Sequence, residues 1–393
     1  MDGEKKNVIW LGFTSFFTDI SSEMILALLP LFLVALGASR ATVGLVEGVA
    51  EATASILKAF SGWISDRMNV RKPFVVIGYT LSTIIKPFIA VANTWHQVLA
   101  VRFFDRVGKG IRTSPRDALI ADSVSVKERG SAFGLQRGMD TAGAVVGTLL
   151  ASGFLFLFSR YTNFDRLMQY RTIFWISIIP GIFAIITVAV FVKDVKAKVR
   201  LKDGEKINLA KLGLPFIFFL LVAAIFELSN FSYALFILRA ADLGVMVALI
   251  PIVYLVYNIV YALLAQPLGA QADRLGRKTL VFAGFFLFAV MNLGFAFASQ
   301  TWQAWALFAF YGVAMAITQS TPRALVADLV PPDVRGTAYG IYYTVIGLIA
   351  LPASAIAGFL WDAHSALLAF SYGAVLSLAA AILLMIFVRP SRA

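Results

Sequence analysis

The chain has 393 residues, of which 60% are hydrophobic and 14% are charged, and its mean hydropathy is +0.82. Soluble domains carry about 25% charged residues, so this composition excludes a soluble globular protein and indicates an integral membrane protein. Because cysteine is absent, disulfides, thiolate metal sites and thiol catalysis are excluded. With only His96 and His364, a histidine metal cluster is excluded as well.

Apolar runs of about 20 residues, long enough to cross a hydrocarbon core of about 30 Å as a helix, recur along nearly the whole chain. They predict an all-α membrane protein with twelve transmembrane helices. The predicted spans are 8–36, 42–63, 73–92, 96–112, 131–158, 172–192, 213–238, 243–267, 279–299, 302–320, 336–360 and 365–388.

The formal net charge is +12, but the basic residues lie in short segments between apolar runs rather than along one polar face. The positive-inside rule explains this better than nucleic-acid binding does. If the helices alternate in direction, most of these segments fall on one side, which predicts that both termini face the cytoplasm. The first apolar run is too long for a cleavable signal core, so we expect an uncleaved, multi-pass protein of the cytoplasmic (inner) membrane.

Two loop segments are nearly identical. The first runs from Gly62 through Asp66 and Arg67, and the second from Gly269 through Asp273. Further matches follow at an almost constant offset, such as Ser114-Pro-Arg with Thr321-Pro-Arg, so two homologous halves are predicted. A polar stretch separates them and reads as a cytoplasmic linker. The predicted division is an N-terminal six-helix bundle at 1–192, a linker at 193–212 and a C-terminal bundle at 213–393.

The second loop matches, without a gap, the signature G-x-x-x-D-R-x-G-R-K of the major facilitator superfamily, which the chain resembles over essentially its whole length. The first copy has one extra residue, Val70, and Asn69 in place of glycine. The resemblance implies two pseudo-symmetric six-helix bundles that rock about a central site. It also implies a conformational latch at these loops, and we expect Asp66 and Asp273 to be its acidic residues. For Arg277, a positive charge that determines membrane topology is an equally good explanation. The predicted latch residues are Gly62, Asp66, Arg67, Gly269, Asp273, Arg274 and Arg277.

Charged residues inside the first half must pair or face water, because a bare charge in lipid is costly. Asp19 and Glu23 lie one helical turn apart in the first span, and Glu51 lies in the second. Lys86 lies midway through the third span, just before Pro87. In the fourth span, steps of three and four residues form one polar stripe made of Arg102, Asp105, Arg106, Lys109 and Arg112.

This stripe resembles the helix-4 motif R-x-x-Q-G-x-G-x-G of the same family, with Arg102 in the arginine position and Gly108 and Gly110 retained. In proton-coupled members that arginine is implicated in proton transfer, so the resemblance implies the same for Arg102. The fifth span adds Arg137 and Asp140 beside a run of glycines. The run loosely resembles the antiporter motif of the family, and close helix packing by small residues is an equal alternative.

The second half has one deep acid, Glu227, near Asn230. Its other cavity candidates are aromatic or amide residues, including Tyr257, Asn258 and Tyr311. We therefore expect a charged first half that couples ions and an aromatic second half that contacts an organic substrate.

Proton-coupled export of a small organic solute or drug by alternating access is the preferred prediction. Asp19 and Glu23 are the expected proton carriers. Burial favours the protonated form of a carboxylate and a nearby arginine such as Arg102 favours the ionised form, so a conformational change can load and release a proton. The alternatives are uptake or exchange of an organic anion, cation or metal transport through the acids of the first two spans, and a non-transporting sensor. Many of these charges are equally explained as structural salt bridges.

An enzyme is disfavoured because no nucleotide loop, histidine cluster or nucleophile elbow is present. We expect no cofactor and no bound metal, with the proton as the coupling ion. The expected partners are a small-molecule substrate and the lipid bilayer, without nucleic acid, and the protein is expected to be a monomer.

Overall fold

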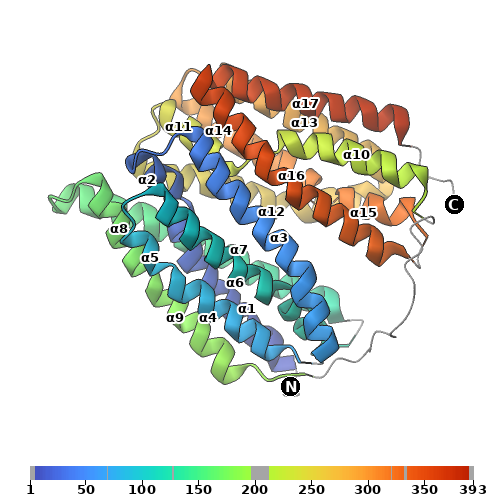
Figure 1. Ribbon diagram of the computed structural model, residues 1–393, viewed down its shortest axis with the longest axis horizontal. Coiled ribbons are helices and arrows are strands. Elements are labelled where there is room, and N and C mark those ends of the chain that lie inside the picture. Colours follow the sequence, from blue (N-terminus) through green and yellow to red (C-terminus); the bar gives the residue numbers. More distant parts are fainter. Residues whose placement is uncertain are drawn as a thin grey trace. The chain divides into compact units, whose positions relative to one another are not determined.

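The computed structural model describes residues 5–68, 70–125, 128–195, 212–319, 321–331 and 334–388. Within these ranges the chain is helical and contains no β-strand. All twelve predicted spans coincide with helical segments, so the all-α fold is confirmed (Figure 1).

In the first half, the helices are α1 (Lys5–Leu26), α2 (Leu29–Ala35), α3 (Arg40–Met68), α4 (Lys72–Ile85), α5 (Pro87–Ala90), α6 (Trp95–Asp122), α7 (Arg129–Tyr161), α8 (Arg166–Ile176), α9 (Ile178–Ile186) and the π-helical turn η2 (Thr187–Phe191). In the second half, they are α10 (Gly213–Ser229), α11 (Tyr233–Asp242), the 3₁₀ turn η4 (Val247–Leu249), α12 (Ile250–Leu275), α13 (Arg277–Phe297), α14 (Thr301–Thr318), α15 (Thr321–Leu329), α16 (Arg335–Ala363) and α17 (Ala366–Phe387).

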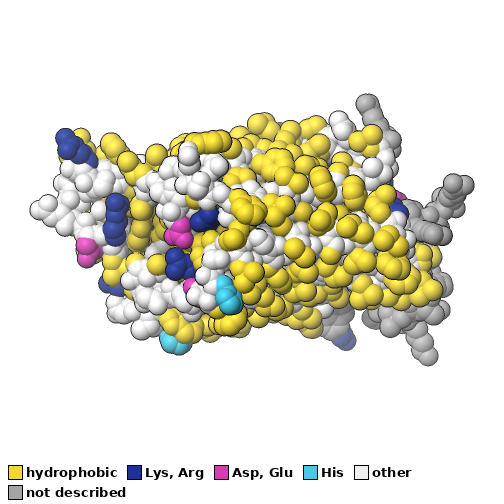
Figure 2. Space-filling model, turned by 90° about the horizontal axis from the view of Figure 1, so that it is seen from above, with side chains coloured by type: hydrophobic (Ala, Val, Ile, Leu, Met, Phe, Trp, Pro, Cys, Tyr) yellow, Lys and Arg dark blue, Asp and Glu magenta, His cyan; other side chains and the backbone are white. Residues whose placement is uncertain are grey.

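Nine helical segments in the described part of the chain are long and apolar enough to cross a membrane. The predicted spans at α3, α6 and α14 are helical but fall outside these nine. In α3 and α6, charged side chains interrupt the apolar sequence. Hydrophobic side chains cover most of the face that Figure 2 shows, as expected of a surface that contacts lipid.

The chain divides into two compact units. Unit 1 comprises 1–38, 49–203 and 247–255, and unit 2 comprises 39–48, 204–246 and 256–393. Each unit is built mainly from one predicted bundle. The bundle boundaries proposed at 192 and 212 stay a prediction, because most of the linker lies outside the described residues.

Glycines hold the helices of unit 1 in close contact. A Cβ atom on Gly143 would lie only 2.3 Å from the carbonyl oxygen of Phe16, and one on Gly147 would lie 2.5 Å from that of Ile20. α7 therefore packs directly on the backbone of α1. The packing interpretation of the glycine run is confirmed at these two positions.

Glycines also bring α4 and α6 into direct backbone contact. A Cβ on Gly108 would lie 2.7 Å from the carbonyl oxygen of Gly78, and one on Gly78 would lie 2.6 Å from Cβ of Arg112. Gly110 meets Leu57 of α3 in the same way, at 2.5 Å. The two glycines retained from the helix-4 motif thus place the polar stripe of α6 against α3 and α4.

Equivalent ion pairs mark the two halves. Arg71 Nε lies 3.8 Å from Asp122 Oδ2, and Arg277 Nη1 lies 2.5 Å from Asp328 Oδ1. Each residue of the second pair lies 206 positions after its counterpart in the first. Arg71 and Arg277 lie at the starts of α4 and α13, and Asp122 and Asp328 lie at the C-terminal ends of α6 and α15, so the sequence repeat is also a structural repeat.

Unit 2 has an aromatic core. The ring of Tyr311 stacks on Phe236 at 4.7 Å and on Tyr257 at 4.5 Å between centroids, and Tyr311 is only 2% exposed. Tyr311 is therefore part of the packed core. Its prediction as a cavity residue was wrong, because the sequence does not distinguish a tyrosine that packs from one that faces a cavity.

Candidate functional site

A cavity of about 500 Å³, including the part that opens to solvent, lies within unit 1. Helices α1 and α6 supply most of its wall, Lys86 contributes from the break between α4 and α5, and α5 adds one apolar residue. Its lining residues are Asp19, Ser22, Glu23, Ile25, Leu26, Lys86, Ile89, Arg102, Asp105, Arg106, Lys109 and Arg112.

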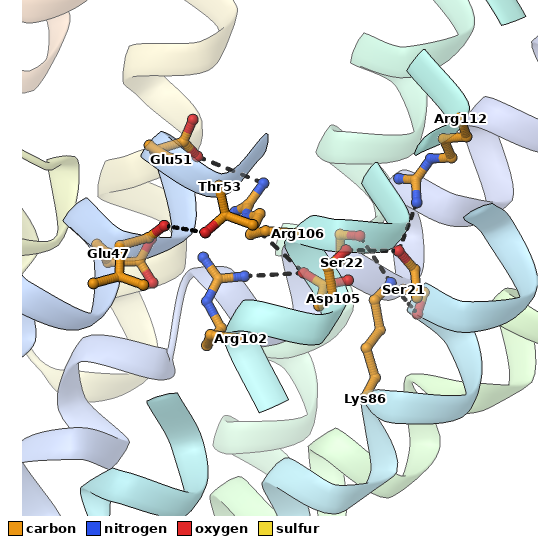
Figure 3. Close-up of polar contacts among 12 residues, drawn as sticks. Ser21, Ser22, Glu47, Glu51, Thr53, Lys86, Arg102, Asp105, Arg106 and Arg112 are labelled. Atoms are coloured by element: carbon orange, nitrogen blue, oxygen red, sulfur yellow. Dashed lines mark hydrogen bonds and ion pairs between the residues drawn. The ribbon is translucent and has the colours of Figure 1, made fainter. Parts of the chain in front are cut away.

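The stripe of α6 provides the core of this site. Arg102 Nη1 bonds Asp105 Oδ2 at 3.2 Å, and Arg106 Nε lies 4.0 Å from the same oxygen. Arg106 Nη1 also pairs with Glu51 Oε1 of α3 at 3.5 Å (Figure 3). The side chains of Arg102 and Arg106 are 2% and 4% exposed, so Asp105 and Glu51 compensate two buried cations.

Lys86 enters the site from the break between α4 and α5. Pro87 begins α5, and because proline has no backbone N–H it favours a break in the helix at this point. The ammonium group of Lys86 donates to Ser21 Oγ at 3.1 Å and to Ser22 Oγ at 2.9 Å, both on α1 (Figure 3). Lys86 is thus buried and held by neutral hydroxyls.

Arg112 is fixed from two sides. Its Nη1 donates to Ser82 Oγ at 2.7 Å, and its guanidinium carbon lies 4.4 Å from the centroid of the Tyr79 ring. Ser82 Oγ in turn donates to the carbonyl oxygen of Asp105 at 3.0 Å. These contacts hold Arg112 against α4, one turn beyond Lys109.

The two carboxylates of α1 differ from Asp105 and Glu51, which pair with arginine side chains. Among the described residues, neither Asp19 nor Glu23 has a hydrogen bond or an ion pair within 4 Å, and Oε2 of Glu23 is buried without a partner. Lys109 likewise has no ion pair or side-chain hydrogen bond in the described part of the chain. The cavity therefore contains unpaired charges of both signs.

Five of the predicted site residues, Asp19, Glu23, Arg102, Asp105 and Arg106, line this cavity, and Glu51 joins it through Arg106. Asp140 is bonded to Gln136 Nε2 at 2.8 Å and lies 4.0 Å from Arg137, whose side chain is 61% exposed. Neither Asp140 nor Arg137 lines the cavity.

The remaining predicted cavity residues belong to unit 2. Asn230 Nδ2 donates to Glu227 Oε2 at 3.2 Å, and the side chain of Tyr257 stacks on Tyr311. Asn258 also lies on α12 and is half-buried.

The predicted latch is described only in part, because the side chains of Asp66, Asp273 and Arg274 lie outside the described side chains. Gly62 lies against Ser114 Cβ, which a Cβ on Gly62 would meet at 3.2 Å. Arg67 is exposed, and Gly269 has open space around it. Arg277 Nη1 pairs with Asp328, an acidic partner that the prediction had missed, and also donates to the carbonyl oxygen of Ala324.

The site predicted for the preferred function left out three cavity cations, Lys86, Lys109 and Arg112, although the sequence identifies them as intramembrane charges and the organic-anion alternative used Lys86 and Lys109. For Lys109 and Arg112 the signal was the spacing of the α6 stripe. Ser21, Ser22 and Ser82 had no such signal, because their role depends on contacts between helices.

Helices long and apolar enough to span a membrane, arranged in two related halves with a charged cavity inside one of them, are the architecture of a membrane transporter. The family model of the Major Facilitator Superfamily matches residues 11–238 and 217–393. The chain belongs to this superfamily.

Relatives and solved structures agree with that assignment. The chain is 39% identical to an uncharacterised MFS-type transporter of Methanocaldococcus jannaschii, over 97% of this chain and 94% of the relative. It is 34% identical to the multidrug resistance protein MdtH of Photorhabdus laumondii, over 32% of this chain and 31% of that protein. The fold is similar to that of a mutant of the nucleoside transporter NupG, with a TM-score of 0.81 at 15% identity, over 97% of this chain and all of that one.

Proposed function

We propose that this protein exports a small organic solute in exchange for protons, by alternating access. The observation that carries the proposal is the pair of carboxylates, Asp19 and Glu23, that line the cavity without an ion pair or hydrogen bond. A carboxylate in such a place changes its proton affinity when the surrounding charge and water change. Cations of α6 that line the same cavity supply that charge.

Asp19 and Glu23 act as the proton acceptors in this proposal. Arg102 modulates them, since its buried guanidinium is held in place by Asp105 and keeps a fixed positive charge at the cavity. Export as the direction is supported by the partial similarity to a multidrug resistance protein, which covers about a third of the chain.

Proton-driven flux in proteoliposomes tests this function. Purified protein is reconstituted with a pH-sensitive dye inside the vesicles, a proton gradient is imposed, and proton movement is recorded on addition of ethidium, benzoate or an amino-acid mixture. We expect at least one solute to move protons, and Asp19→Asn combined with Glu23→Gln to abolish the movement. Gradient-driven transport that persists in the double variant would refute the assignment.

A second candidate function, uptake or exchange of an organic anion, is favoured by the charge of the cavity wall. The lining includes five cations, Lys86, Arg102, Arg106, Lys109 and Arg112, but only three carboxylates, Asp19, Glu23 and Asp105. Metal transport gains no comparable support, because no group of three acidic or histidine side chains within the described residues is placed to hold a metal ion.

We further propose an inner-membrane location, cytoplasmic termini and a monomeric state, with the proton as coupling ion and no cofactor. The distribution of basic residues supports the proposed topology, and membership of the superfamily supports the remaining proposals. Protease accessibility of the termini in oriented vesicles tests the topology.

A further inference from the structure

The cavity of unit 1 carries opposite charges on different walls. The acidic wall is α1, with Asp19 and Glu23 spaced one turn apart. Since Oε2 of Glu23 is buried and accepts no hydrogen bond, the structure leaves an acceptor unsatisfied inside the cavity. A buried acceptor without a partner destabilises the protein unless a ligand or water satisfies it.

The basic wall consists of Lys109 and Arg112 on α6, with Lys86 beside them. None of the three has a carboxylate within 4 Å in the described part of the protein. Lys86 and Arg112 are bound only to neutral groups, and Lys109 has neither an ion pair nor a side-chain hydrogen bond.

The other two cations of the cavity are not available in the same way. Arg102 is bonded to Asp105, and Arg106 is shared between Asp105 and Glu51. These four residues neutralise one another. Within the described residues, the charges of the cavity that lack a carboxylate or cation partner within 4 Å are therefore the two carboxylates on α1 and the three cations of the basic wall.

Charges of opposite sign that share a low-dielectric cavity attract strongly, yet the fold keeps these two walls from pairing directly. A bound solute that carried both charges would compensate both walls. A purely cationic solute would leave Lys109 and Arg112 without an anion, and a purely anionic solute would leave Glu23 unsatisfied.

We propose that the cavity binds a dipolar, amino-acid-like solute, with its protonated amine at Glu23 and Asp19 and its carboxylate at Lys109 and Arg112. This inference rests on the proposed function and names its substrate class. It also gives the exchange a chemical basis: the amine of the solute and the protons compete for the same two carboxylates, so binding of one displaces the other.

Matched ligands test the charge class directly. The thermal unfolding of the purified full-length protein is measured with 4-aminobutyrate, butyrate and butylammonium at equal concentration and ionic strength. We expect 4-aminobutyrate to raise the unfolding midpoint in a concentration-dependent way, and each single-charge analogue to raise it far less. Equal stabilisation by butyrate or by butylammonium, or no stabilisation by any of the three, would overturn the proposal.

Two variants that each remove one charge test the basic and acidic walls separately. Lys109→Gln removes a cation that binds the carboxylate of 4-aminobutyrate, and Glu23→Gln removes the charge that binds its amine. Each variant is expected to weaken binding at least about tenfold, as for loss of a hydrogen bond between charged groups. Arg116→Gln is the matched control, since Arg116 lies on α6 but is paired with Asp117 and does not line the cavity. If one variant fails to fold, the other still tests the assignment, and unchanged binding in either one would contradict it.

Binding and flux separate this inference from the proposed function. If 4-aminobutyrate binds through Lys109 and Glu23 but no solute moves protons, the dipolar site stands and proton-coupled transport is wrong. If benzoate or ethidium drives proton flux while 4-aminobutyrate does not bind, the transporter stands and the dipolar class is wrong.

Discussion

Asp105 offers the sharpest test of the charge network, because its carboxylate is shared by two buried guanidinium groups. Asp105→Asn keeps the size of the side chain but removes the charge that compensates Arg102 at 3.2 Å and Arg106 at 4.0 Å. Arg102 is 2% exposed and Asp105 is 13% exposed, so this is a buried pair. Breaking such a pair from one side costs about 3–5 kcal/mol, since it leaves a buried charge uncompensated.

Asp117 provides a matched control on the same helix. It pairs with Arg116 at 2.9 Å, but its side chain is 43% exposed, so Asp117→Asn is expected to cost at most about 1 kcal/mol. The assay is unfolding in mixed micelles by sodium dodecyl sulfate, followed by tryptophan fluorescence and helical circular dichroism. Combining Arg102→Met with Asp105→Asn should recover part of the loss. Equal losses in Asp105→Asn and Asp117→Asn would refute the reasoning.

Two further predictions concern the scaffold. Gly108→Val places a side chain where even a Cβ would lie 2.7 Å from the backbone of Gly78. We expect the free energy of unfolding to fall by at least about 1–3 kcal/mol, with little monodisperse protein on size exclusion. Gly130→Ala is the control and should behave as wild type, because Gly130 has open space around it. Asp122→Asn should lower the free energy of unfolding by about 1–3 kcal/mol, because its partner Arg71 is only 6% exposed. Asp328→Asn should lower it by at most about 1 kcal/mol, because Arg277 is 30% exposed and keeps its bond to Ala324. Equal losses in the two variants would contradict this reasoning.

The helices could be predicted from sequence because a membrane span needs about 20 apolar residues, and that signal is local. The polar stripe of α6 was also local, since residues three and four apart share one helix face. Arg102, Asp105 and Arg106 were therefore correctly placed together, but no local pattern pairs Arg106 with Glu51, which lies on another helix.

What could not be predicted depends on contacts between distant segments. The hydroxyls of Ser21 and Ser22 that bind Lys86 are more than 60 residues away from it in the chain. Tyr311 was predicted to line a cavity but packs against Phe236 and Tyr257. An aromatic residue in a membrane helix fits a core and a cavity equally well until its neighbours are known.

The internal repeat shows which features of the site the fold itself requires. Gly284 lies 206 positions after Gly78, and a Cβ there would meet Ile317 Cγ2 at 2.7 Å and Thr318 Cγ2 at 3.1 Å. Gly78 meets Arg112, the counterpart of Thr318, in the same way. The close approach of these two helices is thus built twice, once in each half.

The charges of the cavity are not built twice. At the same offset, Arg102 corresponds to Phe308, Asp105 to Tyr311 and Lys109 to Met315, and all three counterparts are buried in unit 2. The second half therefore forms the same helix contact with an apolar and aromatic interior, which shows that the contact does not need the charged stripe. Burying that stripe in the first half costs desolvation energy that packing does not require. This cost supports assigning the charges of α6 to solute binding and to modulation of the α1 carboxylates rather than to holding the helices together.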